Sequence, residues 1–248
     1  MIHAELYPDI DPPGEDDATW AQLMDAYIDR LELHGCAPLI DGFRRLHFHL
    51  VRVEDIAALS RRTEAAFGWR IEAVDSLIDN DAFVELLRSR TFPVAGDMRR
   101  PHEYAFAEFP DFFHDALGHL PLLIHPAYRA FLIEFARVSR LFSHSHTATT
   151  ALGRLYWHTI EVGLVNERGV LKVFGAAIAT SGAECARAMS SETTRIPFDL
   201  EMVLAADYSP FALQPKYFVL ESFDSLPGIT AAMEKTLQRF AEAEAHDH

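Results

Sequence analysis

The chain has 248 residues, of which 49% are hydrophobic and 24% are charged, so it is too apolar for a disordered protein and long enough to bury a sizeable core. Its net charge of −15, from 37 acidic and 22 basic residues, repels phosphate backbones and argues against a nucleic-acid partner. The two cysteines are too few for a disulfide framework and suit a reducing compartment. No apolar run approaches the roughly 18 residues of a membrane span, and the first residues lack the basic and apolar regions of a signal peptide. We therefore expect a cytoplasmic protein without a membrane partner.

The two ends of the sequence differ from its middle. The first residues are rich in proline and acidic side chains, and the last ones alternate acidic residues with alanine and histidine. Between them no linker-like run and no internal repeat is found, which favours one domain over two. We therefore expect a flexible N-terminal segment over residues 1–18, a single domain over 19–240 and an acidic tail over 241–248.

Apolar residues recur at helical spacing along most of this domain. The first such run follows Thr19, a candidate N-cap, and another ends at Gly68, which is placed to stop a helix. Pro126 fits the start of a third. Strand signals are confined to two short segments, 170–174 and 217–220. The sequence therefore predicts an α+β domain that is predominantly helical, with a small β element.

A pair of histidines lies in an apolar segment that spans residues 109–123. His114 and His119 are five residues apart, which on a regular helix is about 140° of rotation, so their rings would diverge. Gly118 and Pro121 permit the helix to end or distort there, and the rings could then converge. On spacing alone, a metal site and two buried, hydrogen-bonded rings are equally good interpretations.

A single carboxylate, Glu161, interrupts an uncharged stretch of the following helix. Burying it without a cation would be costly. Two imidazoles and one carboxylate are the ligand set of a non-haem Fe(II) site, which keeps positions open for O₂. The alternatives place Glu161 at the helix surface or near Arg154. A di-iron site needs more carboxylates, and a zinc hydrolase needs a His-Glu-x-x-His motif, so both rank lower.

Two strings of the sequence carry a family resemblance. They are Pro-Asp-Phe-Phe-His-Asp-Ala-Leu-Gly-His-Leu-Pro-Leu from Pro110 and Tyr-Trp-His-Thr-Ile-Glu-Val-Gly-Leu from Tyr156. They resemble the catalytic domain of the pterin-dependent aromatic amino acid hydroxylases, above all the short bacterial phenylalanine hydroxylases. Shorter segments in the family's order extend the likeness from about Trp20 to Pro227. The resemblance implies that the domain over 19–240 is such a catalytic domain.

The resemblance also implies a role for individual residues. The expected metal ligands are His114, His119 and Glu161. The expected substrate-binding residues are Arg99, Pro110, Asp111, Trp157, Val162 and Thr180. Among them, Arg99 would bind the amino acid carboxylate as a planar fork, with Asp111 supporting it. Phe83 and Asp115 would contact the pterin, and Tyr156 and Asp115 would lie at the reacting groups.

The implied activity is monooxygenation of the ring of a free aromatic amino acid, in the first place L-phenylalanine to tyrosine, with Fe(II), a tetrahydropterin and O₂. The sequence departs from the family at Phe109, where glutamate is usual, at Val162, where phenylalanine is common, and at Thr180, where serine is common. These departures leave open another regiochemistry or substrate, giving meta-tyrosine or hydroxytryptophan, and a non-catalytic relative that only binds an aromatic amino acid. We expect a monomer.

Overall fold

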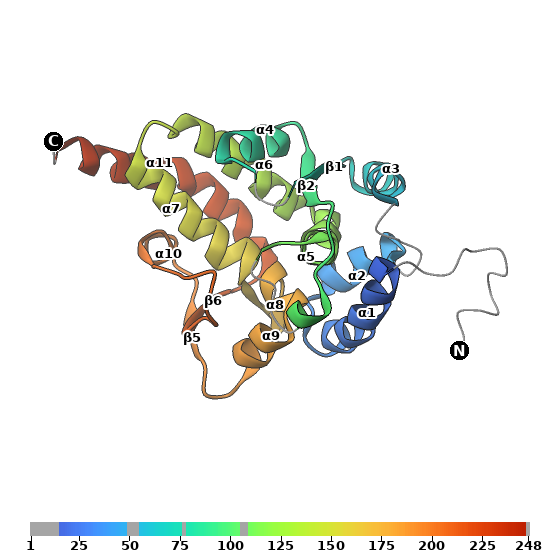
Figure 1. The fold of residues 1–248 in the computed structure, drawn as a ribbon. Coiled ribbons are helices and arrows are strands. Elements are labelled where there is room, and N and C mark those ends of the chain that lie inside the picture. The colour runs from blue at the N-terminus through green and yellow to red at the C-terminus, as the bar shows by residue number, and fades with distance from the viewer. Residues whose placement is uncertain (1–14, 49–54, 76–77, 105–108, 247–248) are drawn as a thin grey trace.

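The computed structural model describes residues 15–48, 55–75, 78–104 and 109–246 (Figure 1). The α-helices are α1 (Glu15–His34), α2 (Ala37–Arg45), α3 (Ile56–Phe67), α4 (Asn80–Arg88), α5 (Phe112–His114), α6 (Pro126–Leu141), α7 (His146–Tyr156), α8 (Ala176–Thr180), α9 (Gly182–Met189), α10 (Leu200–Ala205) and α11 (Leu226–His246). The strands are β1 (Arg70–Val74), β2 (Thr91–Ala95), β3 (Leu164–Glu167), β4 (Val170–Val173), β5 (Thr194–Pro197) and β6 (Lys216–Leu220).

Short turns of other helical types connect several of these elements. The 3₁₀ turns are η3 (Pro101–Glu103), η5 (Leu120–Ile124) and η7 (Phe223–Ser225). The π-helical turns are η4 (Asp115–His119) and η6 (Trp157–Glu161), which continue α5 and α7 directly. Such π-turns often occur at functional sites because their wider ring redirects side chains.

Two small sheets accompany the helices. In the larger sheet the strand order is β4-β3-β6-β5, with β3 and β4 antiparallel and the other two pairs parallel. The turn between β3 and β4 places Arg168 and Gly169 at positive φ, the backbone region that glycine adopts most easily. The smaller sheet pairs β1 and β2 in parallel through α4. The expected small β element is confirmed, although β1, β2, β3 and β5 gave no sequence signal.

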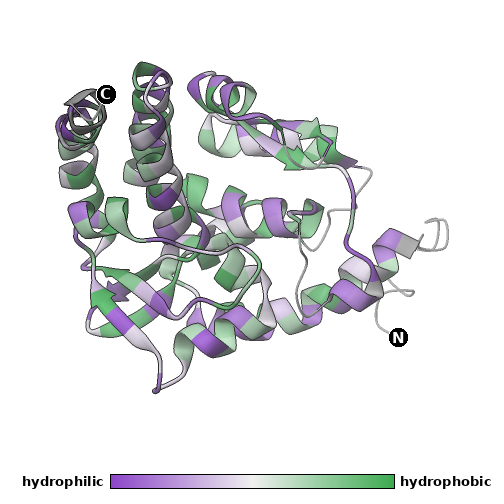
Figure 2. Ribbon diagram, turned by 60° about the vertical axis from the view of Figure 1, so that its left-hand side comes forward, coloured by the Kyte–Doolittle hydropathy of each residue, from purple (hydrophilic) through white to green (hydrophobic). Residues whose placement is uncertain are grey.

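The long helices form the core together. Helix α11 packs against both α6 and α7, and α4 covers another side of α6 (Figure 1). One face of α6 is buried, and each fully buried large apolar side chain there contributes about 1.5–3 kcal/mol. These buried residues are Tyr128, Phe131, Leu132, Phe135 and Val138. Hydrophobic and hydrophilic residues alternate along the long helices in Figure 2, as expected when one face is buried.

The ends of several helices test the sequence predictions. The start of α6 at Pro126 and the end of α3 at Gly68, which adopts a φ of 72°, are confirmed. The prediction that Thr19 caps the first helix is wrong: α1 already includes Glu15, so Thr19 lies inside it and is buried. Acidic residues at 15–17 favour this earlier start because they complement the helix dipole.

The outer segments are only partly described. Of the expected flexible segment over 1–18, residues 1–14 lie outside the described part, and the remainder belongs to α1. Helix α11 runs to His246, so the backbone of the expected acidic tail is helical over 241–246. In the part of the chain that the structure describes, no helix has the length and apolar character to cross a membrane.

Candidate active site

A cavity of about 510 Å³ lies between α6, α7, the two π-turns, α8 and the segment that precedes β6. It gathers residues from distant parts of the sequence, and all but one of the expected site residues line it. Those that line it are Phe83, Arg99, Pro110, His114, Asp115, His119, Tyr156, Trp157, Glu161, Val162 and Thr180. The remaining one, Asp111, lies directly behind Arg99, to which it is hydrogen-bonded.

The three expected metal ligands converge on one point of this cavity. Nε2 of His114 lies 3.3 Å from one carboxylate oxygen of Glu161, and Nε2 of His119 lies 3.3 Å from the other. One ligand atom from each residue can be chosen so that all lie within 4.8 Å of one another. Three ligand atoms at about 2.1 Å from one metal ion lie about 3.0–3.4 Å apart, so this donor set fits a metal ion.

The π-turns explain how residues five apart in sequence meet. In η4 the wider turn brings His119 close to His114, with ring centroids 5.1 Å apart, which a regular helix would not allow. Gly118 lets η4 pack closely against α8, because it has no side chain. A Cβ at this position would lie only 2.5 Å from the side chain of Ala176, which is too close. The distortion expected near Gly118 is therefore confirmed.

The orientation of His114 is fixed by Thr180. The Thr180 hydroxyl donates to the carbonyl oxygen of Ala176 at 2.7 Å, and its oxygen lies 3.0 Å from Nδ1 of His114. Because the single hydroxyl proton is used on Ala176, Nδ1–H of His114 is the donor to Thr180. Nε2, which faces Glu161, is then the nitrogen available to a metal. His119 is held differently, with its ring packed 4.9 Å from that of Phe92 and its buried Nδ1 unpaired among the described residues.

Glu161 is ionised in this setting. Burial opposes its ionisation, but the neighbouring imidazoles of His119 and His114 outweigh burial and hold the pKa of Glu161 well below its usual range. Burial, followed by the charge of Glu161, raises the pKa of Tyr156 well above its usual value, so the phenol is neutral. Burial also raises the pKa of Asp115, whose Oδ2 accepts a hydrogen bond from the backbone N–H of Ala95 at 2.7 Å.

Arg99 and Asp111 form a buried, doubly hydrogen-bonded pair. Nε and Nη2 of Arg99 donate to the two carboxylate oxygens of Asp111 at 2.8 and 2.7 Å. Burial favours the neutral acid, but the hydrogen bonds and charge of Arg99 lower the pKa of Asp111. Nη1 of Arg99 makes one long contact, 3.5 Å to the carbonyl oxygen of Thr180. The outer edge of the guanidinium, formed by Nη1 and the second Nη2 proton, thus remains for a ligand carboxylate.

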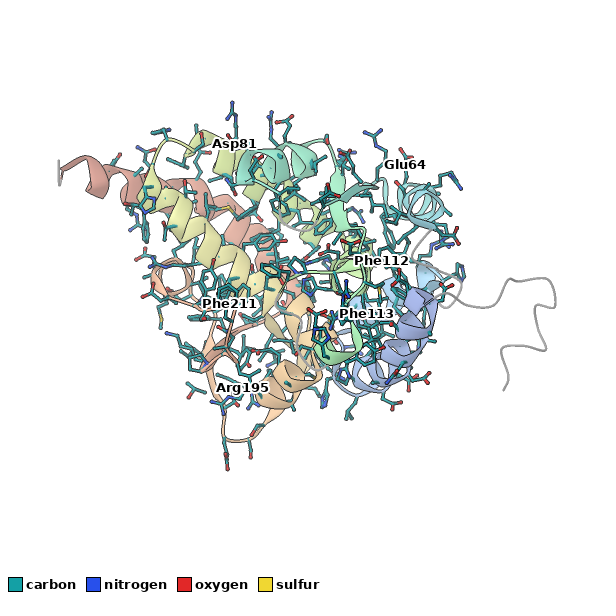
Figure 3. All side chains as sticks on the ribbon, in the orientation of Figure 1. Glu64, Asp81, Phe112, Phe113, Arg195 and Phe211 are labelled. Carbon is teal, nitrogen blue, oxygen red and sulfur yellow. The ribbon has the colours of Figure 1, made fainter. Side chains whose placement is uncertain are left out.

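Aromatic side chains form the walls. The Trp157 ring stacks on that of Tyr208 at 4.8 Å, and its Nε1–H donates to Oε1 of Gln214 at 3.1 Å. The Phe83 ring meets Tyr156 edge-on at 5.5 Å. Phe112 and Phe113, fully buried just before His114, anchor this segment in the core (Figure 3). An apolar pocket with a few placed polar groups is the usual form of a small-molecule site.

Sequence reasoning missed several residues of this cavity. Gln214 and Glu184 are buried polar residues that line it, and Tyr208 and Phe211 line its more exposed part. Gln214 begins the string Gln-Pro-Lys-Tyr-Phe, one of the shorter segments that extend the family resemblance, so a sequence signal existed for it. Tyr208 and Phe211 lie in a segment without regular structure, where no periodic pattern marks them.

We predict that Thr180→Ala weakens iron binding by about 10–100-fold, because His114 loses the group that orients it. Thr180→Ser keeps the hydroxyl and should restore most of the affinity. Iron titration of the metal-free proteins measures this. Thr230→Ala is the matched control, because its hydroxyl donates to a carbonyl four residues earlier in α11, away from the cavity. Equal iron affinity in the Thr180→Ala and unmodified proteins would contradict the prediction.

Comparisons with known proteins agree with this geometry. A family model described as biopterin-dependent aromatic amino acid hydroxylase matches residues 2–244. The phenylalanine-4-hydroxylase of Chromobacterium violaceum is 37% identical over 219 residues, which are 88% of this chain and 73% of that protein. Its crystal structure with iron(III) and 7,8-dihydrobiopterin has a TM-score of 0.84 at 34% identity, covering 93% of this chain and 85% of that one. The structure with iron and phenylalanine has a TM-score of 0.82 at 35% identity and covers 92% and 84%.

Proposed function

The chain belongs to the biopterin-dependent aromatic amino acid hydroxylases, and from this premise we propose that it uses iron and a tetrahydropterin to hydroxylate the ring of free L-phenylalanine, giving tyrosine. One observation carries the proposal for this chain: His114, His119 and Glu161 converge at one point of a cavity that also contains the free edge of Arg99. A metal held by these three ligands would keep positions open for O₂, and the guanidinium that can hold a carboxylate faces the same space.

Each group in the cavity has a task that its chemistry suits. When bound, the iron and the reduced pterin supply the activation of O₂ and the transfer of one oxygen atom to the ring. His114, His119 and Glu161 hold the metal, and Arg99, kept in place by Asp111, holds the substrate carboxylate. Pro110, Trp157, Val162 and Thr180 shape the space for the aromatic ring. Orientation of this kind, together with exclusion of water, lowers the barrier without further functional groups.

Two further residues that line the cavity could hold the pterin. Phe83 offers a ring face for stacking, and Asp115 offers a carboxyl that can accept a hydrogen bond from a ring N–H. Both residues line the cavity. The edge-on contact with Tyr156 helps to fix the orientation of the Phe83 ring. Tyr156, as a neutral phenol next to the ligand set, would face the reacting groups.

The experiment is product analysis. The iron-loaded protein is incubated with a reduced tetrahydropterin, O₂ and either L-phenylalanine, L-tyrosine or L-tryptophan, and the products are identified by mass spectrometry against standards. Para-tyrosine from phenylalanine, coupled to pterin oxidation, is the expected result. Meta-tyrosine or a hydroxytryptophan as main product would indicate the alternative regiochemistry or substrate. Binding of phenylalanine without any product would identify a non-catalytic relative.

We further propose that the enzyme acts in the cytoplasm as a monomer, without a nucleic-acid or membrane partner. The net charge of −15 supports the absence of a nucleic-acid partner, since such a field repels phosphate. The two cysteines, both buried and unpaired, suit a reducing compartment. Light scattering after size exclusion tests the monomer, and a molar mass near twice the 28.0 kDa of one chain would contradict it.

A different product is favoured by one specific feature, the valine at position 162. Val162 follows the ligand Glu161, is 1% exposed and lines the cavity. Valine lacks several carbons of the phenylalanine that is common there, so the substrate ring has more room. A ring displaced by about 1 Å presents a different carbon to the oxidant, and shifts of this size alter rates strongly.

We therefore predict that Val162→Phe changes the ratio of ring-hydroxylated products, or of phenylalanine to tryptophan turnover, several-fold while iron content stays normal. The added ring also overpacks the site, at about 1–3 kcal/mol. Val165→Phe, with the same added volume on buried β3 outside the cavity, controls for overpacking. Product ratios that match in the Val162→Phe and unmodified proteins would mean that this side chain does not shape the pocket.

A further inference from the structure

Glu184 is a buried carboxyl group at the cavity. It is the third residue of α9, 4% exposed, and it lines the same space as Arg99 and Trp157. Its backbone N–H donates to the hydroxyl of Ser181, which caps the helix, so the position of its backbone is fixed. None of the roles inferred above uses this carboxyl group.

The two oxygens of Glu184 differ in their surroundings. Oε1 accepts a hydrogen bond from the hydroxyl of Tyr217 at 2.5 Å and another from the backbone N–H of Gln214 at 3.2 Å. Among the described residues, Oε2 has no hydrogen bond and Glu184 forms no ion pair. Oε2 is not among the fully enclosed polar atoms that lack a partner, so it keeps some exposure, and Glu184 lines the cavity. A rigid carboxyl group therefore presents one free oxygen to the substrate space.

Among the described residues, the charged side chains around the cavity form no ion pair with Glu184. Arg99 is neutralised by Asp111, and Glu161 faces the two imidazoles. Burial raises the pKa of Glu184, and the hydrogen bonds from Tyr217 and Gln214 and the charge of Arg187, three residues further along α9, offset that shift only in part. A ligand that brings a positive charge would satisfy it, and a buried hydrogen bond to a charged group is among the stronger contacts.

Arg99 and Glu184 adjoin the same short connection between α8 and α9. Nη1 of Arg99 contacts the carbonyl oxygen of Thr180, and Glu184 is tied to Ser181, the next residue. A cation and an anion that both contact this connection match the two charges of a free amino acid. Its carboxylate and ammonium are attached to one carbon, so both contacts constrain the same end of the substrate.

We propose that Glu184 binds the α-ammonium group of the substrate and makes the site selective for free amino acids. The inference rests on the function proposed above, with Arg99 as the carboxylate partner. Hydrogen bonds from the ammonium to Oε2 leave Tyr217 and Gln214 on Oε1 undisturbed. The aromatic ring is then directed away from the α8–α9 connection, toward Trp157 and the metal ligands.

The test compares two ligands that differ only in the ammonium group. L-Phenylalanine and 3-phenylpropanoate share the ring, the chain length and the carboxylate. Their dissociation constants are measured by calorimetry on the iron-loaded protein without O₂, in the unmodified form and as Glu184→Gln. The unmodified protein should prefer phenylalanine by about 10- to 100-fold, and in Glu184→Gln this preference should fall to about threefold or less.

The ratio separates the proposed contact from a purely structural role. If Glu184 only holds Gln214 and Tyr217 in place, its replacement weakens the binding of both ligands alike and the preference is unchanged, which overturns the inference. Glu192→Gln, an equal charge change at an exposed residue outside the cavity, should keep the full preference. If Glu184→Gln does not fold, Glu184→Asp is used in its place. The shorter side chain moves the carboxylate away from the ammonium group, so the preference for phenylalanine over 3-phenylpropanoate must also fall.

The two proposals fail in different ways. If the unmodified protein neither binds nor hydroxylates L-phenylalanine, the proposed function is wrong, and the inference with it. If the unmodified protein hydroxylates phenylalanine but binds 3-phenylpropanoate equally well, the function stands and the ammonium contact does not exist.

Discussion

Replacing Glu161 with alanine is expected to remove stoichiometric iron and nearly all turnover, while the fold survives. Two imidazoles alone leave the metal without its anionic ligand, and the carboxylate is the residue that both histidines face. The loss should exceed the about 10–100-fold effect of Thr180→Ala, which disturbs only the orientation of one ligand. Iron is quantified by mass spectrometry after desalting, and folding is followed by circular dichroism.

Thermal denaturation gives a readout of this site that does not depend on catalysis. A metal that binds only the folded state stabilises it by an amount that grows with metal concentration over the dissociation constant. Added Fe(II) should therefore raise the Tm of the unmodified protein and leave that of Glu161→Ala unchanged. Glu161→Gln keeps the size of the side chain and separates loss of the ligand from loss of packing. If Glu161→Ala retains iron and coupled hydroxylation, the triad is assigned wrongly.

The convergence of the histidines is the point at which local sequence rules were insufficient. Helical periodicity places residues five apart on different faces, and only the π-turn η4 brings His114 and His119 together. The sequence contained the permissive residue, Gly118, but not the reason for the distortion. That reason lies in α8, whose Ala176 packs directly against Gly118. The contact joins residues 58 positions apart, and no local pattern encodes it.

The strands show the same limit. Segments 170–174 and 217–220 are predicted as strands because turn-forming glycine or proline residues bound their apolar runs, and β4 and β6 lie there within one residue at an end. Strands β1 and β2 have no such turn signals at both ends, and β2 contains Pro93, which normally argues against a strand. They form because α4 returns the chain to a parallel neighbour, a property of the tertiary structure. The same holds for Glu184, whose hydrogen bonds reach 30 and 33 residues along the chain.

Arg99→Lys is expected to weaken L-phenylalanine binding by about 10- to 100-fold and to leave iron content normal. The guanidinium uses one edge for Asp111 and offers another to the substrate, and it lies over the ring of Phe113, 5.2 Å from its centroid. An ammonium is a single point and cannot serve both carboxylates with paired, planar hydrogen bonds. Some stability is lost as well, although less than the about 3–5 kcal/mol that follows removal of one partner of a buried pair.

The position of the charge can be tested with a ligand that lacks a carboxylate. Phenethylamine keeps the ring and the ammonium, so Arg99→Lys should bind it as the unmodified protein does, whereas phenylalanine should bind more weakly. Arg100→Lys is the matched control, because Arg100 is exposed and lies outside the cavity. If instead Arg100→Lys weakens phenylalanine and Arg99→Lys does not, the carboxylate is bound by the neighbouring residue. Because Arg99 is already paired with Asp111, the pair is nearly neutral by itself, and the substrate carboxylate is held by directed hydrogen bonds from the outer edge of one guanidinium more than by a net positive charge.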